Sequence, residues 1–157
     1  HEAGYSKQQS TRPQKLAYSL ADSPAGQMAW IVEKYATWTD CMRDGVRHPE
    51  NAIERKTLLD IVTHYWMTNT GGSSAKLYWE SFTEGDYRPI ALPIGLSIFP
   101  KELFVCTERL ARTRYQQLVT FNDQHEAGGH FASLEQPEAL IGDIRAWRAT
   151  LQEQRLI

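Results

Sequence analysis

Two short apolar runs in the second half of the chain, each followed by a helical pattern, constrain the fold most. The runs at 94–98 and 118–121 are rich in branched apolar and aromatic side chains, and Phe99-Pro100 closes the first, as expected of buried strands. A helix is expected over about 100–112, between the two runs. A last helix begins at Pro137, and its apolar stripe comprises Leu140, Ile144, Trp147 and Leu151. Strand, helix, strand and helix in this order predict parallel pairing with a right-handed crossover.

Two parallel strands alone do not make a stable sheet, because strands of this kind are covered on both faces and flanked by further strands. The sequence offers no other candidate for a neighbouring strand. The chain also begins with His1 rather than Met. We therefore expect it to be a portion of a larger α/β protein.

The first half has a different texture, with helical periodicity and no convincing strand. Apolar residues recur at helical spacing over 25–39 and again over about 53–67. Asp22-Ser23-Pro24 supplies a capping side chain and a proline suited to the start of the first of these helices, and Ser73 or Ser74 can cap a third that runs through Tyr78-Trp79. The segment 41–49 reads as a polar loop. The change near Gly85 predicts two regions, a helical segment over 1–85 and an α/β segment over 86–157.

Composition excludes few functions. The 157 residues are 41% hydrophobic and 23% charged, with a formal net charge of −2. This balance gives no electrostatic reason to expect nucleic acid or an anionic membrane as partner. No apolar run approaches the roughly 20 residues that span a bilayer. Cys41 and Cys106 are too few for a disulfide framework, and a reduced pair in a cytoplasmic protein is the preferred interpretation.

His130 is the first candidate for chemistry. It follows Gly128-Gly129, after a predicted strand and before a predicted helix, so a glycine loop can present its imidazole at the carboxyl edge of a sheet. An isolated histidine more often satisfies a local hydrogen bond in a turn, but this context favours a catalytic loop. His125 and Glu126 only faintly resemble a zinc-binding helix, because the two histidines stand five positions apart across two glycines.

Glu102 is the second candidate, since it opens the helix expected after the first strand. Functional groups of parallel sheets gather at the carboxyl ends of strands. A carboxylate there can bond the far nitrogen of an imidazole, which is how an α/β-hydrolase supplies the acid and base of its triad. A glutamate in a first helical turn also simply complements the helix dipole. Paired with His130, the catalytic interpretation is the better one.

Tyr5 and Tyr78 are weaker candidates from the residues alone. A phenol in a dry pocket can donate a hydrogen bond to an oxygen that gains negative charge. Tyrosines on helices more often serve packing, and spacing does not separate these two from Tyr18, Tyr35 or Tyr65.

Several blocks, in order along nearly the whole chain, resemble the microsomal-type epoxide hydrolase family. They are Gly4 to Gln14, Leu20-Ala21-Asp22-Ser23-Pro24-Ala25-Gly26, Ala29 to Lys34, Ser73 to Glu80, Phe99-Pro100-Lys101-Glu102-Leu103, Gly128-Gly129-His130-Phe131-Ala132 and Glu135 to Glu138. The Asp-Ser-Pro block and the histidine after paired glycines are the most specific.

The resemblance implies an α/β fold, specifically the C-terminal half of an α/β-hydrolase: a helical cap segment followed by the last two parallel strands and their helices. Family members open epoxides to vicinal diols through a covalent ester on an aspartate. By this resemblance Glu102 is the charge-relay acid and His130 is the base that activates water. Tyr5 and Tyr78 match the cap tyrosines that bind the epoxide oxygen. No metal or organic cofactor is implied.

The departure from the family is that the chain begins inside the cap and contains no nucleophile elbow. Gly71-Gly72 precede Ser73-Ser74, but after a helix rather than a strand. Without a nucleophile no ester can form. We therefore expect the chain to be inactive alone and to act on a small apolar epoxide and water only when complete.

Two other functions stay open. The chain could be a non-catalytic subunit that completes a partner's sheet, the partner being an N-terminal half-protein, or it could form a homo-oligomer. It could also belong to a related hydrolase, such as a dehalogenase or an esterase, although the two tyrosine blocks argue against this. Localisation stays undetermined, with the cytoplasm favoured by the visible part.

Overall fold

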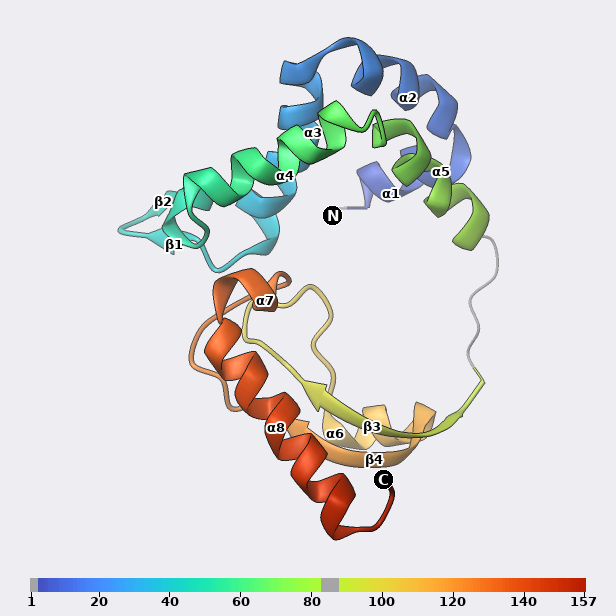
Figure 1. The fold of residues 1–157 in the computed structure, drawn as a ribbon, viewed down its shortest axis with the longest axis vertical. Coiled ribbons are helices and arrows are strands. Elements are labelled where there is room, and N and C mark those ends of the chain that lie inside the picture. The colour runs from blue at the N-terminus through green and yellow to red at the C-terminus, as the bar shows by residue number, and fades with distance from the viewer. Residues whose placement is uncertain (1–2, 83–87) are drawn as a thin grey trace. The chain divides into compact units, whose positions relative to one another are not determined.

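This computed structural model describes residues 3–82 and 88–157, which fall into two compact units. The first unit comprises the described residues of His1–Lys34 and Glu54–Asp86, and the second those of Tyr35–Ile53 and Tyr87–Ile157. Figure 1 labels their helices and strands. The boundary expected near Gly85 lies outside the described residues, and the division into 1–85 and 86–157 stays a prediction.

The first unit is helical. It contains α1 (Gly4–Thr11), α2 (Pro13–Asp22), most of α3 (Pro24–Trp38), α4 (Arg55–Met67) and α5 (Gly71–Ser81). The helices predicted at 25–39 and 53–67 are therefore confirmed as α3 and α4. Pro24 opens α3, and the Ser23 hydroxyl caps it by accepting a hydrogen bond from the Gly26 amide at 3.0 Å.

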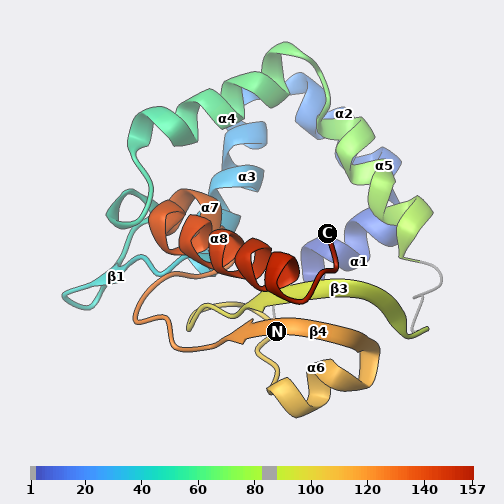
Figure 2. The ribbon, with the colours of Figure 1, turned by 60° about the horizontal axis from the view of Figure 1, so that its bottom comes forward.

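Helix α5 begins earlier than expected, because its two glycines lie inside it. A Cβ at Gly71 would stand 3.0 Å from the Leu20 side chain, and one at Gly72 would stand 2.9 Å from Ala17. Glycine thus lets α5 pack closely against α2, as Figures 1 and 2 show. The prediction that Ser73 or Ser74 caps this helix is wrong. Thr70 holds the cap position, without a side-chain cap hydrogen bond.

The second unit contains a hairpin where a polar loop was expected. Strands β1 (Met42–Arg43) and β2 (Val46–Arg47) pair antiparallel. The turn between them places Asp44 at φ 50° and Gly45 at φ 78°, and positive φ at both central residues is typical of a type I′ hairpin turn. The expectation of no strand in the first half is therefore wrong. The Asp-Gly pair was the available signal.

The rest of the second unit is a two-stranded parallel sheet with helices on both faces. Strand β3 (Ile90–Ser97) leads through α6 (Glu108–Arg114) to β4 (Tyr115–Asn122), and α7 (Ala132–Glu135) precedes α8 (Pro137–Glu153). The pairing of β3 and β4 is parallel, as predicted, with Ser97 opposite Asn122 at the end of the register. Figure 2 shows α8 on one face of this sheet and α6 on the other. The predicted α/β class is confirmed.

The helix expected at 100–112 is wrong in its start. The α6 helix begins at Glu108, where the Thr107 hydroxyl accepts a hydrogen bond from the Leu110 amide at 3.4 Å. Glu102 instead lies in an irregular segment between β3 and α6. The Glu102 amide donates to the Phe99 carbonyl at 3.1 Å in a turn, and the preceding residue, Lys101, forms an isolated parallel bridge with Gly129. None of the helices in the described ranges is long and apolar enough to cross a membrane.

Candidate active site

Glu102 and His130 form a hydrogen-bonded pair in the second unit. Glu102 Oε1 lies 2.7 Å from His130 Nδ1, and the Leu103 amide donates to the same oxygen at 2.6 Å. A carboxylate only accepts, so in the neutral imidazole Nδ1 carries the proton and Nε2 keeps its lone pair. The His130 side chain is 38% exposed, and within 3–82 and 88–157 its Nε2 has no hydrogen-bond partner. An imidazole in this state can take a proton from water.

The two loops that carry this pair are joined through their backbones. The Lys101 amide donates to the Gly128 carbonyl at 3.0 Å, and the His130 amide donates to the Trp38 carbonyl at 2.9 Å. Gly128 has φ +106°, and a Cβ at Gly129 would lie 2.6 Å from the Trp38 carbonyl oxygen. The paired glycines are therefore required by backbone conformation at one position and by close approach at the other. The reason that the sequence suggested, a backbone angle closed to other residues, is therefore confirmed for Gly128 and wrong for Gly129.

Glu135 holds the histidine loop from the other side. Its Oε1 accepts from the Phe131 amide at 3.0 Å and its Oε2 from the Asp40 amide at 2.7 Å. Asp40 in turn accepts from the Gly128 amide at 3.2 Å. Hydrogen bonds to a charged acceptor are stronger than neutral ones. Two carboxylates thus restrain the backbone on both sides of His130.

A second polar cluster, which the sequence did not indicate, joins the ends of β3 and β4 to α8. We call Ser97, Asn122, His125 and Asp143 the strand-end cluster. Asp143 Oδ1 accepts from the side-chain amide of Asn122 at 2.8 Å, while Oδ2 lies 2.8 Å from His125 Nε2 and accepts from the Ser97 hydroxyl. The only available signal was an aspartate beside the apolar stripe of α8.

The electrostatics of the strand-end cluster favour an ionised Asp143. Partial burial raises the pKa of its carboxyl. The hydrogen bonds from Ser97, Asn122 and His125, with the charge of His125, outweigh that effect and bring the pKa below its ordinary value. A charged carboxylate accepts only, so His125 Nε2 carries a proton toward Asp143.

The strand-end cluster does not have the geometry of a catalytic triad. Ser97 Oγ lies 2.9 Å from His125 Nε2, the same nitrogen that faces Asp143. In a charge relay the acid and the nucleophile bind opposite nitrogens of the imidazole. The serine here has no free base to activate it, so the cluster has a different role from that of the Glu102–His130 pair.

The two tyrosines lie together in the first unit. The rings of Tyr5 and Tyr78 meet edge to face, with centroids 5.8 Å apart, and Lys34 Nζ lies 4.7 Å from the Tyr5 ring centroid. Burial raises the pKa of Tyr78, and the charge and hydrogen bond of Tyr5 add to this effect. A hydrogen bond from Gln9 and the charge of Lys34 oppose it. Tyr78 therefore keeps its proton at neutral pH and can donate it in a hydrogen bond.

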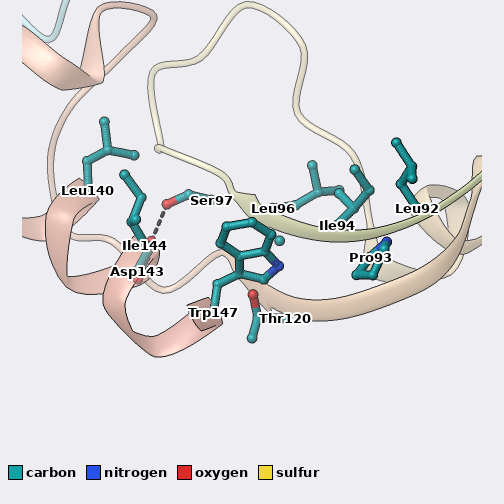
Figure 3. Close-up of a pocket in the computed structure, with 11 residues that line it drawn as sticks. Leu92, Pro93, Ile94, Leu96, Ser97, Thr120, Leu140, Asp143, Ile144 and Trp147 are labelled. Atoms are coloured by element: carbon teal, nitrogen blue, oxygen red, sulfur yellow. Dashed lines mark hydrogen bonds between the residues drawn. The ribbon is translucent and has the colours of Figure 1, made fainter. Parts of the chain in front are cut away.

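A cavity of about 360 Å³ lies between β3 and α8, close to the strand-end cluster. Figure 3 shows Ser97 and Asp143 bonded at one end, with Leu92 and Pro93 at the other. Most of its lining is apolar. Two of the apolar lining residues are largely exposed, Leu92 at 69% and Ile144 at 51%. The described residues contain no group of three or more His, Cys, Asp or Glu side chains arranged for a metal ion.

Known proteins resemble the chain over nearly its full length. No protein-family model matches it. A putative epoxide hydrolase from Stigmatella aurantiaca is 44% identical over 149 residues, which are 92% of this chain and 32% of the relative. Epoxide hydrolase 1 of Sus scrofa is 35% identical over 98% of this chain and 35% of its own length.

Solved structures of epoxide hydrolases also match the chain over nearly its full length. The crystal structure of juvenile hormone epoxide hydrolase from the silkworm Bombyx mori superposes with a TM-score of 0.86 at 30% identity, over 98% of this chain and 41% of that chain. The chain belongs to the microsomal-type epoxide hydrolase family. Aspergillus niger epoxide hydrolase gives a TM-score of 0.77 at 34% identity, over 94% of this chain and 35% of that one. The chain spans about a third of the length of the curated epoxide hydrolases it matches.

Proposed function

We propose that the chain supplies the water-activating pair of an epoxide hydrolase, with Glu102 as the acid and His130 as the base. The observation that carries the proposal is the 2.7 Å contact between Glu102 Oε1 and His130 Nδ1 on two loops joined by their backbones. The relatives named above are epoxide hydrolases, which favours this chemistry over that of a dehalogenase or an esterase. Within the proposal, residues 1–85 are the cap segment and 86–157 the core segment.

The proposed reaction has two steps. In the first, an aspartate supplied by the rest of the enzyme forms a C–O bond to one epoxide carbon while the ring C–O bond breaks. Tyr5 and Tyr78 donate hydrogen bonds to the ring oxygen as it gains negative charge. In the second, His130 Nε2 takes a proton from water, the hydroxide attacks the ester carbonyl, and the acyl C–O bond breaks. The imidazolium returns its proton to the leaving oxygen, the proton of the new carboxyl group neutralises the ring alkoxide, and the diol leaves with the aspartate regenerated. Glu102 stabilises the imidazolium that forms.

The chain by itself should not hydrolyse epoxides, because the nucleophile belongs to the rest of the enzyme. The test is an assay of the purified chain on styrene oxide, a small apolar epoxide. We expect no diol. Diol production that disappears in His130→Ala would overturn this assignment, because it would require a nucleophile within the chain.

The complete enzyme gives the complementary test. With the missing part restored, His130→Ala should form the ester and fail to hydrolyse it, so intact-mass measurement should show the enzyme heavier by one epoxide. Tyr78→Phe should instead slow ester formation. An His130→Ala enzyme that turns over normally and accumulates no ester would contradict the role of His130.

A second function, completion of a partner's sheet, is favoured by the free edge of β3. Within 3–82 and 88–157, β3 pairs with β4 along one edge and with no strand along the other. The adjoining cavity opens among exposed apolar side chains such as Leu92. An exposed edge of this kind pairs readily with another chain. Co-purification with an N-terminal half-protein would support this function, and a stable monomer by light scattering would count against it.

A further inference from the structure

The strand-end cluster stands where the two candidate catalytic loops begin. Ser97 is the last residue of β3 and Asn122 the last of β4, and they are register partners. The Ile98 amide donates to the Asn122 carbonyl at 2.7 Å. Glu102 lies on the segment that follows Ser97, and His130 on the segment that follows Asn122. The relative position of these two strand ends therefore sets where both loops start.

Asp143 bonds all three other members, and His125 Nε2 contacts the same set, lying 2.9 Å from Ser97 Oγ and 3.3 Å from Asn122 Nδ2. Its two carboxylate oxygens contact a group at the end of β3, one at the end of β4 and one on the histidine loop, from Ser97, Asn122 and His125 respectively. The side chain is 23% exposed, so much of it has left water. Removing one partner of such a network leaves other buried groups unsatisfied.

Packed rings continue the contact toward the catalytic pair. The His125 ring stacks on Phe99 with centroids 4.1 Å apart and planes 3° from parallel. Phe99 is only 3% exposed, and a Cβ at Gly128 would stand 2.8 Å from its ring. Phe99 belongs to the loop that carries Glu102, and Gly128 to the loop that carries His130. The backbone pairing of Lys101 with Gly129 follows directly.

We propose that Asp143 is a positioning residue: by joining Ser97, Asn122 and His125, its carboxylate holds the two loops in the register that brings Glu102 to His130. This inference rests on the proposed function for its catalytic meaning. It differs from a simple anchoring of α8 on the sheet, because an anchor would affect stability and leave the Glu102–His130 hydrogen bond unchanged. Contacts that form a continuous network can transmit a change at Asp143 to the Glu102–His130 pair. A measured response at His130 is what establishes this coupling.

The test reads the imidazole of His130 directly in the 157-residue chain, without turnover. Long-range ¹H–¹⁵N spectra of the labelled chain report the tautomer and hydrogen bonding of each histidine, and His130→Gln assigns the His130 signals. Glu102→Gln then defines the spectrum of His130 without its carboxylate. In Asp143→Asn we expect the His130 nitrogen shifts to move by at least half of that change, toward the Glu102→Gln values.

Controls separate the possible failures. Asp123→Asn changes an exposed aspartate of the same loop and should leave the His130 shifts unchanged. If Glu102→Gln itself does not move the His130 signals, the proposed acid–base pair fails. If Glu102→Gln moves them and a folded Asp143→Asn does not, the positioning role of Asp143 is overturned.

A milder variant covers the case in which Asp143→Asn does not fold. Ser97→Ala removes one of the donors to the carboxylate and leaves the charge in place. The His130 shifts should then move in the same direction by a smaller amount. Unchanged His130 shifts in a folded Ser97→Ala chain would overturn the proposal in the same way.

Discussion

His130 Nδ1 lies 2.7 Å from Glu102 Oε1, although the two residues come from different loops after different strands. The contact follows from topology, because parallel strands end at the same edge of their sheet. Close pairing of the two loops adds the final alignment, since Lys101 and Gly129 form a backbone bridge directly beside the two side chains. The remaining contacts around the pair lead to four predictions.

Gly128→Ala should destabilise the second unit. Gly128 has φ +106°, and a Cβ there would lie 2.8 Å from both Phe99 and Gln136. Strain and overlap together predict a loss of about 2–4 kcal/mol in the free energy of unfolding. Urea denaturation measures the change. Gly142→Ala is the matched control: nothing lies within 4 Å of a Cβ at this position in α8, so that variant should gain about 0.5–1 kcal/mol.

Glu135→Gln should loosen the histidine loop. The carboxylate accepts from the Phe131 and Asp40 amides at 3.0 and 2.7 Å, and an amide side chain retains only one oxygen. We expect a loss of about 1–3 kcal/mol in the free energy of unfolding, together with faster amide hydrogen exchange at Phe131. Exchange at Phe131 that stays as slow as in the original chain would contradict the role of Glu135. Glu126→Gln, an exposed neighbour, should stay within about 0.5 kcal/mol.

Asp143 should make the free energy of unfolding depend on pH in the acid range. Its folded pKa is below the ordinary value of 3.8, because hydrogen bonds from Ser97, Asn122 and His125 outweigh the opposing effect of burial. The unfolded chain therefore takes up the proton first as pH falls. The stabilisation is fully present above the ordinary pKa and is lost as pH falls through the folded pKa. Urea midpoints from neutral pH to about pH 3 should fall less steeply in Asp143→Asn than in Asp123→Asn.

Tyr78 should titrate late. Burial, then the charge and hydrogen bond of Tyr5, raise its pKa above 10.0, with Gln9 and Lys34 acting in the opposite direction. Ultraviolet absorbance of tyrosinate during alkaline titration should lose its latest component in Tyr78→Phe. Tyr18→Phe, which changes a 68% exposed tyrosine, should retain that component. An unchanged late component in Tyr78→Phe would show that another phenol is responsible.

The helices predicted at 25–39, 53–67 and from 137 onward are confirmed. Each has an apolar stripe at helical spacing, and part of that stripe is buried, such as Leu58 and Val62 in α4 and Leu151 in α8. The predicted starts of α5 and α6 are wrong. In the sequence, Gly71-Gly72 predicts a break, but both glycines lie within α5. Because they have no side chains, α5 can pack closely against Leu20 and Ala17. The sequence around Glu102 predicts the opening of a helix, but Glu102 ends a turn, and the bridge of Lys101 to Gly129 ties its segment to the histidine loop.

By itself the sequence determined the parallel order of β3 and β4, the glycine loop before His130 and the resemblance that paired His130 with Glu102. These depend on local pattern and on motif, which a linear sequence contains. Only the tertiary structure decided the strand-end cluster and the two hydrogen bonds that Glu135 accepts from the Phe131 and Asp40 amides. Asp143 and Glu135 are ordinary helix residues in sequence, and they gain a role because the fold brings distant amides, a hydroxyl and an imidazole within hydrogen-bonding distance of their carboxylates.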